Sequence, residues 1–198
     1  MKKGIIAVLC LLLIGSAAFT LDKAAGAGLL IGETFQGGSI TENYYDYYSY
    51  TVDWTFNRTS FGAFAFFGLS QYLEFNFAFM HKAGEASVST SDGENYTGGG
   101  PEPTSAVGLG IYGKYPIPLS DRFVFFPTAG LDFEFNFEEN WWDDLWIRGG
   151  VGIDYFLGDT IFLRGHFIYG AAIPVGEDEL KPDVGHGLLA KVGIGFMF

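Results

Sequence analysis

Cysteine is almost absent from this chain of 198 residues. The one cysteine, Cys10, lies inside the apolar run of the amino-terminal segment. Leu9 precedes it at a position where a lipoprotein signal requires a small residue, so the sequence disfavours lipid attachment at Cys10. Once that segment is removed the chain contains no cysteine, which excludes disulfides and thiol chemistry.

Positive charge is scarce as well. Lys and Arg total 11 against 23 Asp and Glu, and the formal net charge is -12. Nucleic-acid binding requires clustered Lys and Arg to neutralise phosphates, and the sequence has no such cluster. The loop acids also lack the spacing of a calcium loop, so we interpret them as solvated charges, with weak bridging of divalent cations to the membrane surface as the alternative. We therefore expect no nucleic-acid partner, no metal and no cofactor.

Long hydrophobic runs are missing too. A helix that crosses a bilayer needs about 20 apolar residues, whereas the longest run spans residues 5–14. Two lysines precede this run and small residues follow it, which is typical of a secretory signal peptide. We expect residues 1–18 to be a signal peptide cleaved after Ala18, and residues 19–198 to form a single domain.

Aromatic residues and glycine are abundant. Phe contributes 21 residues and Gly 29, and 48% of the chain is hydrophobic while only 17% is charged. This composition is typical of a sheet-rich protein that faces an apolar solvent. Because lipid offers no partner to an open sheet edge, a membrane protein built from strands must close into a barrel.

Segments in which apolar side chains alternate with other residues recur along the chain. In residues 188–198 one face carries only Leu188, Ala190, Val192, Ile194, Phe196 and Phe198. Lys191 is the only charge on the opposite face. The same division predicts eight strands, near residues 25–35, 59–67, 72–80, 107–112, 122–138, 145–156, 161–169 and 188–198.

The connections between these segments alternate in length. Short turns are expected at 68–71, 116–121 and 158–159, and longer connections at 37–47, 83–103, 139–144 and 173–185. The second turn contains two prolines, which cannot donate to a ladder. Short turns at one end and longer loops at the other are typical of outer-membrane barrels. The predicted fold class is all-β, an eight-stranded antiparallel up-and-down transmembrane β-barrel.

The leader, the alternation, the unequal connections and the final Phe198 together resemble small eight-stranded bacterial outer-membrane barrels of the OmpX, OmpA and OmpW kind. The resemblance covers the chain after the leader and is specific for architecture, not for one family. It implies export to the cell outer membrane, contact with outer-membrane lipid, and recognition of Phe198 as an assembly signal by the barrel assembly machinery.

The polar side chains of the predicted strands share the inward face. They are Glu74, Lys114, Asp132, Glu134, Arg148, Asp154, Arg164, His166 and Lys191. Facing lipid at the bilayer midplane costs an Arg or Lys about 2–4 kcal/mol, so a shared inward face is favoured. The strand order predicts two lumenal ion pairs, Glu134 with Arg148 and Asp154 with Arg164.

Aromatic residues are expected at three places. An inward floor near the short turns comprises Phe64, Phe66, Tyr72, Phe126, Phe156, Phe162 and Met197. Two further clusters comprise Tyr44, Tyr45, Tyr47, Tyr48, Tyr50 and Trp54, and then Trp141, Trp142 and Trp146. We interpret these two clusters as membrane-interface aromatics, with contact to a partner as the alternative.

Eight strands leave an interior just wide enough for side chains. We therefore expect a non-enzymatic barrel, structural or surface-interacting, whose extracellular loops contact an extracellular protein or a surface ligand. The alternative is a narrow channel or transporter for small hydrophobic molecules, as in OmpW-like barrels. A lipid-modifying enzyme is disfavoured because His166 has no serine neighbour on its strand. A secreted soluble barrel that binds apolar ligands would share the alternation.

Truncation of Phe198 is predicted to impair membrane insertion before it affects any activity, because the terminal aromatic is the expected assembly signal. Comparing the amounts of truncated and parent protein in the membrane fraction tests this. Normal membrane levels of the truncated protein would count against the role of Phe198.

Overall fold

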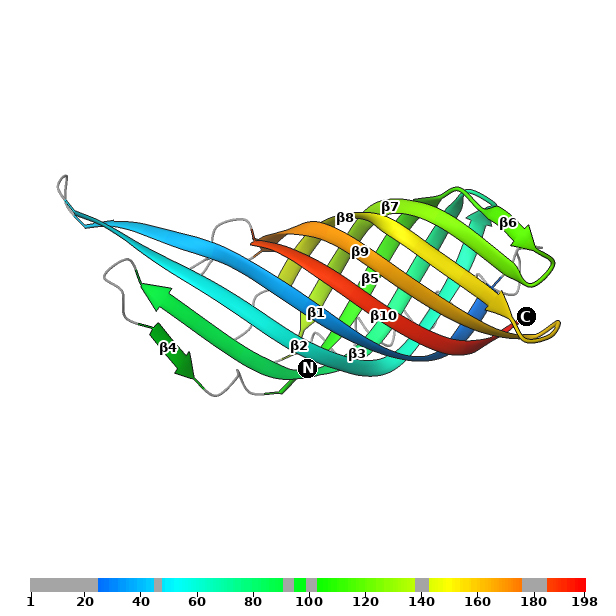
Figure 1. Cartoon of the computed structure of the whole chain (residues 1–198), viewed down its shortest axis with the longest axis horizontal. Helices are drawn as coiled ribbons and strands as arrows, with labels where there is room; N and C mark the ends of the chain where they lie inside the picture. Colours follow the sequence, from blue (N-terminus) through cyan, green and yellow to red (C-terminus); the bar gives the residue numbers. More distant parts are fainter. Residues whose placement is uncertain (1–24, 45–47, 91–94, 99–102, 138–142, 176–184) are drawn as a thin grey trace.

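The computed structural model describes residues 25–44, 48–90, 95–98, 103–137, 143–175 and 185–198 (Figure 1). The predicted signal peptide, residues 1–18, lies outside these ranges. No helix in the described ranges is long and apolar enough to cross a bilayer.

Eight long strands make up the barrel. They are β1 (Ala25–Tyr44), β2 (Tyr48–Ser70), β3 (Leu73–Thr90), β5 (Thr104–Lys114), β7 (Phe123–Asn136), β8 (Asp143–Phe156), β9 (Ile161–Val175) and β10 (Gly185–Met197). Each pairs antiparallel with the next, and β10 pairs with β1 to close the sheet. The predicted fold, a closed eight-stranded antiparallel barrel, is confirmed.

Two further strands are short. Within the described ranges, β4 (Asn95–Gly98) pairs only with β3, and β6 (Ile117–Ser120) pairs only with β7. The expected turn at 116–121 was therefore wrong, because most of it is strand. Pro118 is tolerated there because β6 is an edge strand with a register shift between Pro118 and Ser120.

The outer face carries a continuous apolar belt because the alternation puts one apolar side chain after another on that face. Every barrel strand contributes at least one exposed apolar residue: Leu29, Phe61, Phe79, Ile111, Leu131, Ile147, Phe167 and Val192. A soluble monomer rarely exposes a contiguous apolar patch beyond a few hundred Å². The exterior is therefore suited to lipid.

The closing pair of strands runs from Gly26 opposite Met197 to Gly37 opposite His186. Beyond it, the Phe198 N–H donates to the Ala25 carbonyl at 3.0 Å. The Phe198 side chain is 73% exposed, so it packs little against the rest of the barrel.

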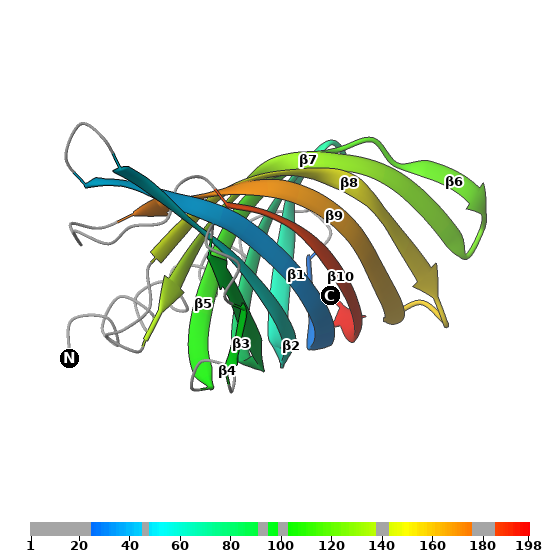
Figure 2. The same cartoon turned by 60° about the vertical axis from the view of Figure 1, so that its left-hand side comes forward.

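The two ends of the barrel differ. At the turn end the connections β2–β3, β6–β7 and β8–β9 are short, and at the hairpin end the strands extend much further (Figures 1 and 2). β1 and β2 remain paired up to Tyr44 opposite Tyr48, and β3 runs to Thr90. The expected connections 37–47, 83–103 and 173–185 were thus too long, because polar residues outside the apolar belt continue the ladders without the alternation. The expected connection 139–144 had the right length but the wrong place, since β7 ends at Asn136 and β8 begins at Asp143.

Candidate functional site: the lumen

Arg164 is the centre of an ion-pair cluster at the turn end. Its Nε and Nη2 donate to the two Asp154 carboxylate oxygens at 2.7 and 2.8 Å. Its Nη1 donates to Glu74 Oε1 at 2.9 Å, and Lys114 pairs with the other Glu74 oxygen. Strand register places Asp154 opposite Arg164, so this predicted ion pair is present. Because Glu74 lies on β3 and Arg164 on β9, the cluster crosses the lumen.

Aromatic rings pack against this cluster. The Arg164 guanidinium lies 3.8 Å from the Phe66 ring centre, and the Phe162 side chain is fully buried. Phe64 and Phe66 both meet Phe162 edge to face, with centroids 6.0 and 5.5 Å apart. Tyr72 does not belong to this floor. It is 49% exposed and stacks on Tyr115, because it lies in the β2–β3 turn.

A second cluster lies further toward the hairpin end. Asp132 accepts hydrogen bonds from Tyr112 and Arg148 through the same carboxylate oxygen. Lys82 pairs with Glu134.

The predicted pair of Glu134 with Arg148 was wrong. The register of β7 and β8 places Gly130 opposite Arg148 and Asp144 opposite Glu134. Arg148 therefore reaches Asp132, the nearer inward carboxylate of β7. Glu134 instead forms an ion pair with Lys82. Lys82 lies on β3, which is separated from β7 by β5 in the sheet.

Trp54 and Trp146 are lumenal, so their assignment to the membrane interface was wrong. Their side chains are 6% and 3% exposed. Glycine makes the room they need, because a Cβ at Gly38 would lie 2.7 Å from the Trp54 ring and one at Gly187 would lie 3.2 Å from the Trp146 ring. The Trp146 ring also lies 4.3 Å from the Arg148 guanidinium carbon, a cation–π distance.

Of the other predicted interface aromatics, only Tyr44, Tyr48 and Tyr50 lie in the described part of the chain. Tyr45, Tyr47, Trp141 and Trp142 lie outside the described residues. The backbones of Tyr44, Tyr48 and Tyr50 belong to β1 and β2. Their interface role stays a prediction.

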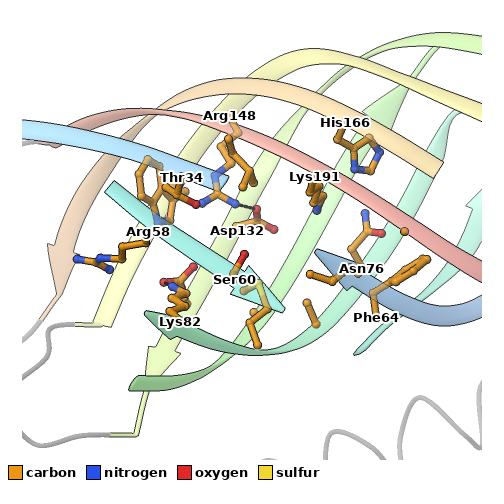
Figure 3. Close-up of a pocket in the computed structure, with 18 of the residues that line it drawn as sticks. Thr34, Arg58, Ser60, Phe64, Asn76, Lys82, Asp132, Arg148, His166 and Lys191 are labelled. Atoms are coloured by element: carbon orange, nitrogen blue, oxygen red, sulfur yellow. Dashed lines mark hydrogen bonds and ion pairs between the residues drawn. The ribbon is translucent and has the colours of Figure 1, made fainter. Parts of the chain in front are cut away.

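A cavity of about 60 Å³ lies between the two ion-pair clusters (Figure 3). His166, Lys191 and Asn76 line it, and the close-up shows Arg148 paired with Asp132 nearby. His166 packs edge to face on Phe126, with centroids 5.6 Å apart. Its Nδ1 is buried with no hydrogen-bond partner among the described residues.

Two lumenal cations were missed from the sequence, Arg58 and Lys82. Both are 7% exposed and share the inward parity of their strands. They were overlooked because the predicted second strand began at residue 59 and the third ended at residue 80. Extending each alternation by two residues would have found them. With these two, six cations and four acids face the lumen among the described side chains.

The remaining histidines face outward. His81 Nδ1 lies 3.2 Å from Ser105 Oγ on the neighbouring strand, and its ring lies 5.3 Å from Phe61. His186 is exposed and its ring lies 6.4 Å from Tyr169. Within the described ranges no group of three or more His, Cys, Asp or Glu is placed to hold a metal ion.

Solved structures of outer-membrane barrels are similar to this chain in fold alone. OprG of Pseudomonas aeruginosa has 13% identity and a TM-score of 0.45, over 89% of this chain and 95% of that one. The amino-terminal barrel of P. aeruginosa OprF has 13% identity and a TM-score of 0.42, over 87% of this chain and 99% of that one. Neisserial surface protein A has 12% identity and a TM-score of 0.43, over 87% of this chain and 99% of that one. No family model and no curated protein matches the sequence.

Replacing Arg164 with Met is predicted to destabilise the barrel by about 3–5 kcal/mol, because Asp154 loses its only ion-pair partner among the described residues and Glu74 loses one of two. Urea unfolding of the refolded protein measures the loss. Adding Asp154→Asn should recover part of it, since one unpaired charge disappears.

The exposed turn residue Arg122 provides the matched control. Arg122→Met should change the unfolding free energy by no more than about 0.5 kcal/mol. Equal effects of the two Arg substitutions would show that the lumenal cluster contributes nothing beyond a surface charge.

Proposed function

We propose that this chain is a non-enzymatic outer-membrane barrel that holds extended hairpins outside the cell for contact with an extracellular protein or a surface ligand. The observation that supports this proposal most directly is the length of the β1–β2 hairpin. Its ladder continues from Gly38 opposite Trp54 to Tyr44 opposite Tyr48, whereas the β1–β10 ladder ends at Gly37. The hairpin therefore projects past its neighbour β10 (Figure 1).

The apolar belt supports insertion in a membrane. Exposed Leu29, Phe61 and Phe167 are 67%, 59% and 55% accessible, and burial of apolar area in lipid is favourable by roughly 25 cal/mol per Å². The predicted leader and the unequal barrel ends favour the outer membrane, with lipid and the barrel assembly machinery as partners. The hairpin end then faces outward.

The filled lumen favours a scaffold over a channel. Arg164 joins β8, β9 and β3, and the fully buried Phe162 packs beside it. Both would have to move for a solute to pass the turn end. A rigid, closed barrel holds its hairpins in fixed positions, as expected of a scaffold for surface contacts.

Shortening the hairpin tests the surface role. Ile40 and Val52 are paired, so residues 41–51 can be replaced by Asn-Gly, which joins paired residues in a tight turn. Whole cells carrying this variant should lose binding to surfaces coated with basic proteins, because the deleted segment carries Glu42 and Asp46 and no Lys or Arg. An acidic coat serves as the comparison.

Two controls accompany the shortened hairpin. The heat-dependent gel shift of the folded barrel should be unchanged, because the deletion lies beyond the β1–β10 ladder. A full-length variant in which Tyr44, Tyr45, Tyr47, Tyr48 and Tyr50 become Ser distinguishes loss of the tyrosines from loss of length. Unchanged cell binding by the shortened variant would refute the role of this hairpin.

Planar-bilayer recording tests the closed lumen. The parent protein is expected to conduct far less than a general porin under the same conditions, because the ion pairs and rings fill the eight-stranded interior. Porin-like conductance would contradict the closed lumen. Uptake of an apolar solute that requires the barrel would instead favour the alternative, a narrow transporter for small hydrophobic molecules.

A further inference from the structure

Among the described side chains, the lumenal cavity has more positive than negative charge around it. All four described lumenal acids already have cation partners: Glu74 has Lys114 and Arg164, Asp132 has Arg148, Glu134 has Lys82, and Asp154 has Arg164. Lys191 lines the cavity and makes no ion pair with any described residue. This is notable in a chain whose net charge is -12.

His166 lies beside this lysine. The two residues face each other across the β9–β10 ladder, and both line the cavity. The buried Nδ1 of His166 has no hydrogen-bond partner in the described part of the chain. Buried polar atoms are normally hydrogen-bonded, so an unpartnered ring nitrogen beside a cavity indicates that something occupies it.

Asn76 supplies a third group. Its amide lines the same cavity from β3, on the far side of the lumen from β9 and β10 (Figure 3). An ammonium and an amide NH₂ are donors, and a neutral imidazole donates through Nδ1 in the tautomer that carries its proton there, which is the tautomer that the proposed site requires. Three such donors around one cavity, with every described lumenal carboxylate already paired, match an acceptor that carries negative charge.

The size of the cavity restricts the ligand. A cavity of about 60 Å³ accommodates one small anion with a few water molecules, but not a large organic anion. We propose that the lumen binds one small monovalent anion, of the chloride or formate class, between Lys191, His166 Nδ1 and Asn76. The site does not depend on the role of the hairpin.

The physical reason is the cost of leaving the charge of Lys191 unpaired inside the lumen, away from bulk water. A bound anion removes that cost and satisfies the histidine at the same time. Water alone would hydrate Lys191 but leave the excess positive charge. The competing state is a neutral lysine, which needs no anion.

Anion dependence of thermal stability tests the site. The parent protein is refolded from urea in sodium chloride, sodium formate or sodium gluconate at equal ionic strength, so that the anion is present while the lumen forms. Gluconate is too large for the cavity. The apparent Tm should be higher in chloride or formate, by roughly 2–6 °C for each tenfold rise in concentration above Kd.

Lys191→Met removes the unpaired cation, and its Tm should be the same in all three salts. Its Tm in gluconate should equal or exceed that of the parent, because no isolated charge is buried. Lys82→Met removes a lumenal cation that has a partner, so it should lower Tm in every salt but keep the anion response.

Anomalous diffraction from crystals of the full-length parent grown in sodium bromide locates the ion directly. A bromide peak beside Lys191 Nζ that disappears in Lys191→Met supports the proposal. Equal Tm values of the parent in chloride, formate and gluconate, an unchanged response in Lys191→Met, or no peak in the cavity would each overturn it. A response to only one of chloride and formate identifies which anion the cavity accepts.

Discussion

A barrel in lipid depends on pairing of every backbone N–H and C=O within the protein, because the surrounding hydrocarbon offers no partner. Here the constraint is met by the ladder between β1 and β10, continuous from Gly26 opposite Met197 to Gly37 opposite His186. Without it, two edges would be open to lipid at once. Closure also fixes the interior, since the inward half of every strand must then share one narrow space.

That narrow space explains the composition of the inner face. Large rings such as those of Trp54 and Phe162 fit only beside glycine: a Cβ at Gly38 would lie 2.7 Å from Trp54, and one at Gly195 would lie 3.0 Å from Phe162. Charges fit only as pairs or networks, because an isolated buried ion is costly. The abundance of glycine and aromatics in the sequence is thus a packing requirement of the lumen as well as of the lipid-facing surface.

The architecture could be predicted because it depends on a period of two, which the sequence shows directly. The inward parity of the strand charges and the pairing of Asp154 with Arg164 followed from it, since a short turn fixes the register between β8 and β9. The pairing of Arg148 could not be predicted, because β7 and β8 are joined by a longer connection that leaves the register open.

Trp54 and Trp146 show a different limit on what the sequence can predict. Trp54 and Trp146 have inward parity, but their position beside polar segments and the usual preference of indoles for the interface pointed outward. The space that accepts Trp146 comes from Gly187, on a strand 41 positions later in the chain. A complementarity of this kind is set by the closed barrel and is not visible within one segment of sequence.

Arg164 has a consequence for the order of folding. Its pair with Asp154 is local, ten positions apart, whereas its pair with Glu74 spans 90 positions and joins strands that are not neighbours. The distant pair can form only once the sheet has curled enough to bring β3 and β9 face to face. Such late contacts slow unfolding more than they speed folding. The ion-pair network at the turn end therefore lowers the rate at which the closed barrel unfolds.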